Sequence, residues 1–338
     1  MALLQFTDKG IYCKQADVYI DPWRPVKKAL ITHGHSDHSR WGHQYYLCTA
    51  EAAPVIRLRL GKINLEQIHF GETKMINGVK FSFHPAGHII GSAQIRVEYK
   101  GEVWVASGDY KIQNDHLSLP FEPVKCHTFI TESTFGLPVY KWKKQESVFE
   151  DINQWWQKNK EEGKVTVLTG YALGKAQRLL KGLNPDIGTI YTHGAIENVN
   201  AIIREQGYVF PDTIRITQDH KAKDFVGNLV LATPSAVGTQ WMKRFKDVSV
   251  GIASGWMALR GTRRRRAVDR GFVLSDHADW DGLNWAIRET GAEKVIVTHG
   301  YTGIFRRWLE EQGLEAIETK TEFEGELSEI GEESTSED

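Results

Sequence analysis

Short apolar runs bounded by polar residues dominate the first third of the chain and predict β-strands. Residues 79–88 (VKFSFHPAGH) alternate apolar and polar positions before a Pro and a Gly interrupt the pattern. The runs QIRVEY and EVWVASGDY are separated by Lys100 and Gly101, which predicts a hairpin. Residues 27–33 (KKALITH) and 127–134 (HTFITEST) are further apolar runs that end in polar residues. Several predicted strands therefore finish at His, Asp or Glu, and loops above a rigid sheet are where α/β enzymes place their sites.

The middle of the chain changes to a helical period. Residues 147–163 (SVFEDINQWWQKNKEEG) have apolar positions at helical spacing and end in Gly. A buried strand (VTVLTG), a second helix (ALGKAQRLLKGL) and more alternating strands and helices follow, which predicts a parallel, doubly wound α/β unit. The last part returns to the style of the first. We therefore expect a second domain, residues 136–255, inserted into a first domain formed by residues 1–135 and 256–320.

Composition adds size and charge to this picture. The chain has 338 residues, of which 41% are hydrophobic and 25% charged, which is typical of a globular protein of about two domains. The net charge of −1 hides an uneven distribution. Residues 321–338 hold eight acidic residues and no basic one, so the rest of the chain carries +7. We expect a mildly basic body followed by a disordered acidic tail.

Cysteine usage and the N-terminus bear on the compartment. Cys13, Cys48 and Cys126 are widely spaced and imply neither a disulfide framework nor a zinc knuckle, so a reducing cytoplasm is favoured. The N-terminus lacks the basic and apolar regions of a secretory signal, and no apolar run has the length of a transmembrane helix. These features predict a cytoplasmic protein without a membrane segment.

The strongest chemical signal is a histidine cluster. Residues 32–38 (THGHSDH) place four potential metal ligands directly after a predicted strand. Imidazole and carboxylate ligands without cysteine suit a catalytic zinc site, although a histidine run can also be a surface accident. Three distant candidates, His88, Asp109 and His299, also follow apolar strands. Each alone is more often a structural residue, but their joint occurrence with the cluster predicts a metal site.

These motifs resemble a known family. HGHSDH, PAGHIIGSAQ, SGDY and a late strand followed by His-Gly resemble the metallo-β-lactamase superfamily, and ITESTFG, YALGKAQ and LSDHAD resemble its β-CASP nucleases. Over residues 3–324 the chain is similar to bacterial ligase-associated DNA exonucleases. The resemblance implies an α/β fold: a metallo-β-lactamase αββα sandwich (1–135 and 256–320) with an inserted β-CASP α/β domain (136–255).

The resemblance also implies a dinuclear metal site. One ion would be held by His33, His35 and His88, and the other by Asp37, His38 and His299. Asp109 would bridge the two, and Asp21 in YIDPW would support the site by hydrogen bonding. Zinc is the expected metal, with manganese as the alternative, because such ligand sets accept several divalent ions.

The expected chemistry is phosphodiester hydrolysis. Two metal ions about 3.5–4 Å apart generate a nucleophile at neutral pH and stabilise charge on the phosphoryl oxygens. Besides the ligands Asp37 and Asp109, the resemblance assigns catalysis to Glu132 and His277, which would protonate the leaving group, with Glu132 orienting the imidazole and raising its pKa. Without the resemblance, a carboxylate near a helix N-terminus is an equally good interpretation of Glu132.

Substrate contacts are expected from basic and polar positions. Four consecutive arginines just before the His277 loop predict phosphate contacts and salt-sensitive binding, although they could also form a solvated helix face. The turn GYALGK between a strand and a helix could present backbone N–H groups and a lysine to phosphate. The candidate substrate-binding residues are Lys111, Tyr171, Lys175, Ser235, Arg263, Arg264, Arg265 and Arg266.

The resemblance to ligase-associated DNA exonucleases implies a metal-dependent 5′→3′ DNA exonuclease that acts in repair, with a functional link to a DNA ligase and a helicase. A β-CASP ribonuclease is the alternative, because RNA-processing relatives carry a histidine at the position of His299 whereas eukaryotic DNA-processing ones tend to lack it. A small-molecule hydrolase of the same fold would need neither the insertion nor the arginines. A catalytically inactive nucleic-acid-binding scaffold would be expected to have lost ligands, and this chain has the full set.

Overall fold

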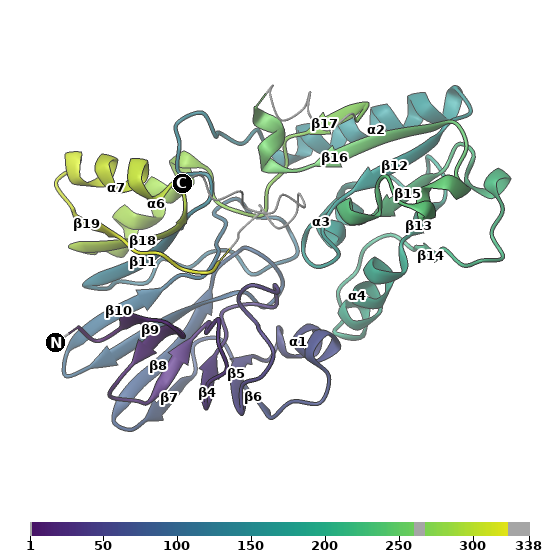
Figure 1. Cartoon of the computed structure of the whole chain (residues 1–338). Coiled ribbons are helices and arrows are strands. Elements are labelled where there is room, and N and C mark those ends of the chain that lie inside the picture. The colour runs from purple at the N-terminus through teal and green to yellow at the C-terminus, as the bar shows by residue number, and fades with distance from the viewer. Residues whose placement is uncertain (1, 260–267, 324–338) are drawn as a thin grey trace. The chain divides into compact units, whose positions relative to one another are not determined.

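A computed structural model describes residues 2–259 and 268–323 of the chain (Figure 1). The chain divides into two compact units. One runs to Lys141 and resumes at His277, and the other spans Trp142–Asp276.

Two sheets form the middle of the first unit. The first sheet contains, in spatial order, β1 (Gln5–Thr7), β2 (Gly10–Cys13), β3 (Val18–Ile20), β4 (Lys28–Leu30), β5 (Tyr45–Thr49) and β6 (Leu65–Ile68). The second contains β19 (Glu315–Glu318), β18 (Lys294–Gly300), β11 (Thr128–Ser133), β10 (Glu102–Ala106), β9 (Ala93–Tyr99), β8 (Val79–Pro85) and β7 (Thr73–Ile76). Strands β7 to β10 form an antiparallel meander, and β10, β11, β18 and β19 are parallel neighbours.

Side-chain alternation along these strands builds four layers. Leu30 of β4 and Trp104 of β10 belong to one core cluster shared by the two sheets. The neighbouring Ala29 faces the opposite way and packs with α1 (Ala53–Leu60). Val105 of β10 packs with the helices α6 (Trp280–Thr290) and α7 (Thr302–Glu311). The unit is therefore an αββα sandwich, in which the described residues place one helix outside the first sheet and two outside the second.

The hairpin predicted at Lys100 and Gly101 is confirmed. Strands β9 and β10 pair antiparallel with Tyr99 opposite Glu102, and both turn residues have positive φ (50° and 85°). Two positive φ values match the right-handed twist of the strands, as in a type I′ turn.

The second unit contains a parallel sheet. Its order is β14 (Ile214–Arg215), β13 (Ile190–Thr192), β15 (Leu229–Ala232), β12 (Val165–Thr169), β16 (Val248–Ala253) and β17 (Arg270–Phe272). The α-helices among its described residues are α2 (Gln145–Glu161), α3 (Lys175–Gly182) and α4 (Gly194–Glu205). Every residue of the central strands β12 and β15 is buried, as expected of parallel strands covered on both faces.

The C-terminal boundary of the inserted unit differs from the predicted one. Strand β17 lies beyond residue 255 and pairs with β16, so the inserted unit extends further toward the C-terminus than the predicted boundary. The pairing adds β17 as the edge strand of this parallel sheet.

Cysteines and membrane segments complete the fold. The three cysteines are free and buried. Among the described helices, none combines the length and apolar character needed to span a bilayer.

Candidate metal centre

The ends of several strands of the first unit bring the predicted ligands together. The loop after β4 carries residues 32–38, the loop after β8 carries His88, and the loop after β10 carries Asp109. Parallel strands end at the same edge of a sheet, so Asp109, Glu132 at the end of β11 and His299 at the end of β18 become neighbours. Residues that are up to 266 positions apart in sequence thus line one small site.

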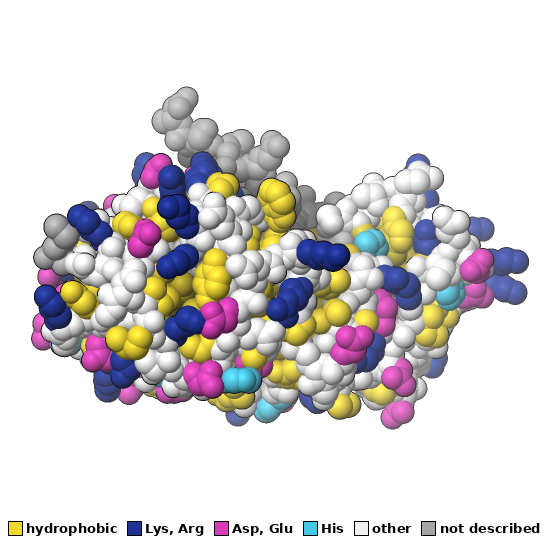
Figure 2. Space-filling view, turned by 90° about the horizontal axis from the view of Figure 1, so that it is seen from below, with side chains coloured by type: hydrophobic (Ala, Val, Ile, Leu, Met, Phe, Trp, Pro, Cys, Tyr) yellow, Lys and Arg dark blue, Asp and Glu magenta, His cyan; other side chains and the backbone are white. Residues whose placement is uncertain are grey.

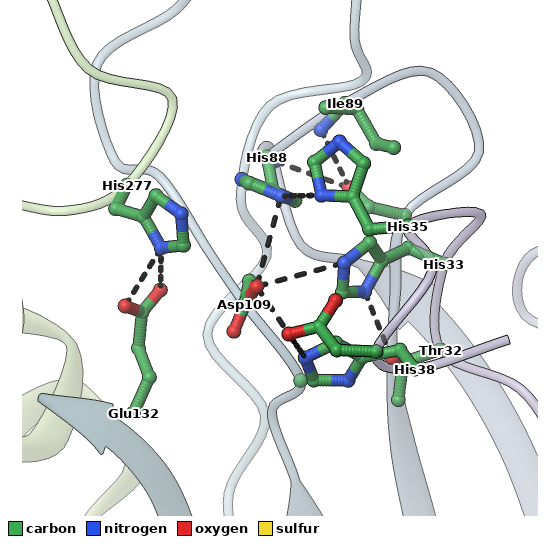
Figure 3. A network of polar contacts seen from close by, with 12 residues as sticks. Thr32, His33, His35, His38, His88, Ile89, Asp109, Glu132 and His277 are labelled. Carbon is green, nitrogen blue, oxygen red and sulfur yellow. Dashed lines mark hydrogen bonds and ion pairs between the residues drawn. The ribbon is translucent and has the colours of Figure 1, made fainter. Parts of the chain in front are cut away.

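Asp109 lies at the centre of this site (Figure 3). Its Oδ2 is 3.5 Å from Nε2 of His33, 3.5 Å from Nε2 of His38 and 3.8 Å from Nε2 of His88. Its Oδ1 is 3.0 Å from Nε2 of His299. Ligand atoms that bind one tetrahedral zinc ion at 2.0–2.1 Å are about 3.3 Å apart, so these distances suit shared coordination.

The remaining candidates lie around this centre. Nδ1 of His35 is 3.1 Å from Nε2 of His88, and Oδ2 of Asp37 is 3.6 Å from Nε2 of His38. Within the described part of the chain, three clusters have ligand atoms within 4.8 Å of one another, and every one contains Asp109. The clusters are His33, His35, His88 and Asp109; His38, Asp109 and His299; and Asp109, Glu132 and His277. The first two match the two predicted ion sites except that Asp37 belongs to neither.

Unsatisfied polar atoms test whether these residues fit a metal ion. Nε2 of His33, Nε2 of His38, Nε2 of His299 and Oδ1 of Asp109 are all buried, and none of them makes a well-directed hydrogen bond among the described residues, although the last two lie 3.0 Å apart as an ion pair. A buried polar atom without a partner costs about 1–3 kcal/mol. Four such atoms converging on one point fit a cation better than any polar contact between the side chains themselves.

The shifts in pKa at this site also favour a bound cation. Burial lowers the pKa of His38, but the carboxylates of Asp109, Asp37 and Asp21 outweigh it and raise that pKa to about 10. Burial raises the pKa of Asp109, but His38, His277 and His299 lower it well below its usual range. Burial, with nearby His38, lowers the pKa of His33. Without a metal ion, the protonated imidazole of His38 therefore balances the negative charge of Asp109. A metal cation bound to His38 would displace this proton.

A second layer of hydrogen bonds orients the ligands. Oδ2 of Asp21 lies 2.8 Å from Nδ1 of His38, and its carboxylate also accepts from the backbone N–H and the hydroxyl of Thr32. The contact predicted for Asp21 is therefore present. Arg59 in the last turn of α1 donates to the carbonyl of Gly34 and to Oγ of Ser39, which fixes the ligand loop from below.

Local backbone features place His299 and Asp109. Thr131 pairs with Val297 and Ser133 with Gly300, so β18 has one residue more than β11 between these pairs. Such a bulge re-aims side chains beside active sites, here at His299. Gly108 precedes Asp109 with φ +57°, and a Cβ there would lie 2.7 Å from Cβ of Thr32, so only glycine fits this approach.

Glu132 and His277 form a buried pair beside the metal candidates (Figure 3). Nδ1 of His277 is 2.8 Å from Oε2 and 3.0 Å from Oε1 of Glu132, and Oε1 also accepts from the backbone N–H of Tyr110. Glu132 lies on β11 and the next helix begins only at Gln145, so the interpretation of Glu132 as a carboxylate near a helix N-terminus is wrong.

The predicted substrate-binding residues have different outcomes. Lys175 is fully buried, with its Nζ 3.4 Å from Oδ2 of Asp276 and donating to the carbonyl of Leu274. The prediction that it reaches a phosphate is therefore corrected, because its charge already balances a buried carboxylate. Lys111 is also buried, at 1% exposure. Tyr171 is half-buried and Ser235 is exposed.

The predicted basic patch cannot be placed. Residues 263–266, the four arginines, lie outside the described residues. On the face shown in Figure 2, the lysine and arginine side chains of the described residues are interspersed with acidic ones rather than gathered in one stripe.

The structure also shows residues that the sequence did not single out. Arg178 of α3 donates to Asp276, 3.0 Å away, so the residue before His277 is held by both Lys175 and Arg178. Phe323 stacks on His38, with ring centroids 4.2 Å apart. The charged residues in ALGKAQR and LSDHAD could have indicated the contact between Arg178 and Asp276. No local pattern in the sequence indicates the contact between Phe323 and His38.

Known proteins can now be compared with this chain. No family model matches it. It is 30% identical over 311 residues to a probable DNA ligase from Opitutus terrae, an alignment that covers 91% of this chain and 30% of that protein. It is 25% identical over 210 residues to an RNase J-like protein from Methanocaldococcus jannaschii, covering 53% of this chain and 50% of that protein. The chain thus spans half or less of the length of these relatives.

A solved structure is similar in fold. The crystal structure of a protein of unknown function from Enterococcus faecalis V583 matches with a TM-score of 0.62, covering 86% of this chain and 78% of that chain. The identity is 11%, so this likeness concerns the fold alone.

Architecture and relatives together confirm the predicted fold class, the metallo-β-lactamase sandwich with an inserted α/β unit. The similarity to the RNase J-like protein, and to a protein named endoribonuclease YSH1 from Kluyveromyces lactis over 118 residues, supports the predicted resemblance to β-CASP nucleases of this fold. Nuclease activity is proposed for this chain on that basis. The narrower resemblance to ligase-associated DNA exonucleases remains a prediction.

Proposed function

We propose that this protein is a metal-dependent nuclease with a dinuclear site, and that it degrades DNA from a 5′ end. The observation that carries the proposal is the convergence of five histidines on Asp109, with four buried ligand atoms that make no well-directed hydrogen bond among the described residues. Zinc is the proposed metal and manganese the alternative, because imidazole and carboxylate ligands accept both.

The ligands would divide between two ions. His33, His35 and His88 would hold one, and His38, His299 and Asp37 the other, with Asp109 between them. When bound, two such cations lower the pKa of a water molecule and offset negative charge on the phosphoryl oxygens. Asp21 and Thr32 would keep the imidazole of His38 in one orientation while substrate binds and product leaves.

His277 would supply the proton to the leaving oxygen. The carboxylate of Glu132 fixes the proton of the ring on Nδ1, so that Nε2 is the atom that exchanges a proton with substrate. The ring of His277 lies 4.6 Å from that of His88, centroid to centroid, which keeps the acid beside the proposed ligands.

The length of one match supports DNA as the substrate. The alignment to the probable DNA ligase covers 91% of this chain, whereas those to a cleavage and polyadenylation specificity factor subunit from Arabidopsis thaliana and to the RNase J-like protein cover 70% and 53%. A role in DNA repair, functionally linked to a ligase and a helicase, belongs to the same proposal. The substrate-binding roles of Tyr171, Ser235 and the four arginines, and cytoplasmic location, also remain proposals.

A ribonuclease is the second candidate. The RNase J-like relative favours it, and so does His299, which lies 3.0 Å from Asp109 as a ligand would.

One digestion series separates these possibilities. The full chain, stripped of metal and then supplied with Zn²⁺ or Mn²⁺, is incubated with matched DNA and RNA oligonucleotides labelled at either end. We expect metal-dependent release of short products from 5′-phosphorylated DNA, and loss of activity in Asp37→Ala with the fold retained. Faster digestion of RNA would establish the second candidate, and digestion unaffected by chelator would overturn the metal site.

A further inference from the structure

The last described segment of the chain returns to the candidate metal centre. Phe323 is 9% exposed and its ring lies almost parallel to that of His38, at 11° with centroids 4.2 Å apart. It also meets His299 edge-on, at 80° and 5.5 Å. One phenyl ring therefore contacts two proposed ligands of the same ion.

Hydrogen bonds hold this segment in place. Thr319 donates its backbone N–H to the carbonyl of Val297, which extends the contact with β18 toward His299. The carboxylate of Glu322 lies 2.5 Å from Nη1 of Arg24, and the carbonyl of Glu322 accepts from Arg40. Phe323 is thus anchored by neighbours on two sides.

Arg40 ties the segment directly to the ligand loop. Its Nε donates to the carbonyl of Asp37 at 3.3 Å, while its Nη2 donates to the carbonyl of Glu322 at 2.9 Å. A displacement of the segment around Phe323 would therefore also shift the backbone that carries Asp37 and His38.

His38 is restrained in two different ways. Asp21 fixes its Nδ1, which leaves the ring free only to tilt about that hydrogen bond. Phe323 covers one face of the His38 ring and restricts this tilt. The Phe323 ring in turn packs against the ring of Trp23, with centroids 5.6 Å apart and an angle of 81° between the ring planes. Offset-stacked and edge-on rings are the preferred aromatic arrangements, so this packing stabilises one orientation of the imidazole.

We propose that Phe323 is a positioning residue for the metal ion bound by His38 and His299, and that the segment 319–323 completes this ion site from the C-terminal side. The inference rests on the proposed dinuclear site. It adds a residue that no motif marks and that lies 24 positions after the last proposed ligand.

The test compares metal binding by full-length Phe323→Ala, Phe323→Tyr and Phe70→Ala. Phe70 packs against the same core cluster, and the described residues show no ring contact between it and a proposed ligand. Metal-free protein is titrated with Co²⁺ in competition with a chelator, and the visible absorption of the bound ion reports its coordination. Thermal unfolding of the metal-free variants controls for folding.

We expect Phe323→Ala to bind one of its two ions about ten-fold more weakly, the lower end of the range for partners of metal ligands, with an altered absorption spectrum. Phe323→Tyr should retain wild-type affinity because it keeps the ring, and Phe70→Ala should match wild type. Two ions bound by Phe323→Ala with wild-type affinity and spectrum would overturn the inference alone. Wild-type protein that binds no metal would overturn the proposed function and the inference with it.

Discussion

Asp109 connects the parts of the site at the scale of single residues. It is 2% exposed, it contributes an atom to each of the three potential metal clusters, and its charge is balanced by several histidines. A carboxylate has two oxygens and could bind two cations that lie close together, which is the role proposed for Asp109.

Asp109→Asn should abolish nuclease activity while retaining the fold. The amide keeps the size of the side chain but loses the charge that offsets the surrounding cations. We expect kcat to fall by at least about 100-fold, because mutation of residues that only hydrogen-bond to metal ligands already lowers activity by up to about 100-fold. Initial rates on a labelled oligonucleotide measure it. The exposed Asp186→Asn should behave as wild type, and equal rates for both variants would contradict a bridging role.

His43 gives a pH dependence that is independent of the metal. Burial lowers its pKa from 6.5 to about 4, and its Nδ1 accepts from the backbone N–H of Val26, so the folded state holds it neutral. The unfolded chain binds a proton here between pH 4 and 6.5 and the folded chain does not. Stability should therefore fall as the pH drops from 6.5 to 4.

His43→Gln tests this contribution, because Gln keeps an acceptor for Val26 but does not titrate. Urea unfolding at pH 7 and pH 4.5 should show a smaller loss of stability in this variant than in wild type. The exposed His69→Gln serves as the control. An identical loss in all three proteins would remove His43 as the cause.

At the scale of elements, strand ends and tight turns position the candidate metal ligands at one edge of the sheets. The bulge in β18 turns His299, the positive φ of Gly108 brings Asp109 against Thr32, and α1 supports the ligand loop through Arg59. These features position the backbone segments that carry the candidate ligands.

Gly108→Ala should destabilise the protein and weaken metal binding. The new methyl would lie 2.7 Å from Cβ and Oγ1 of Thr32, and overpacking of this kind costs about 1–3 kcal/mol. Gly78→Ala is the matched control, since Gly78 also has positive φ (+81°) but no atom within 4 Å of the new Cβ. Urea unfolding and metal titration of both variants measure the difference, and equal effects would show that backbone strain alone is responsible.

The second unit depends on a buried charge cluster. Arg178 is 2% exposed and pairs with Asp276 at 3.0 Å, while Lys175 approaches the same carboxylate at 3.4 Å. Arg178→Met should cost about 3–5 kcal/mol of unfolding free energy, because it leaves a buried carboxylate with one partner fewer. Arg306→Met, which removes the exposed pair with Glu310, should cost at most about 0.5 kcal/mol. Similar losses in denaturant unfolding would contradict the buried pairing.

At the scale of the whole molecule, metal binding and folding are linked. The unpartnered ligand atoms come from the loops after β4 and β10 and from the end of β18, so an ion would join segments that are distant in the chain. Such an ion stabilises only the folded state.

Removal of metal should therefore lower the thermal stability. An ion present at 100 times its Kd contributes about 2.7 kcal/mol, which is about 5–11 °C in Tm for a unit of this size. Calorimetry before and after treatment with chelator, with add-back of Zn²⁺, measures the shift. A Tm that does not change on removal and add-back would mean that the site binds no ion in the folded protein.

The sequence by itself determined the strands, the hairpin at Lys100 and Gly101, the inserted parallel unit and the identity of the candidate ligands. These are local signals: apolar period, turn residues, and histidine or aspartate directly after an apolar run.

Only the tertiary structure decided which polar groups meet. Lys175 lies in a loop that looks suited to phosphate, yet the fold buries it against Asp276 because a buried carboxylate requires a cation. Phe323 has no sequence signal, yet it stacks on His38, since contact between positions 285 residues apart depends on the path of the whole chain. Local patterns fix what a residue can do, and long-range packing fixes the partner with which it does it.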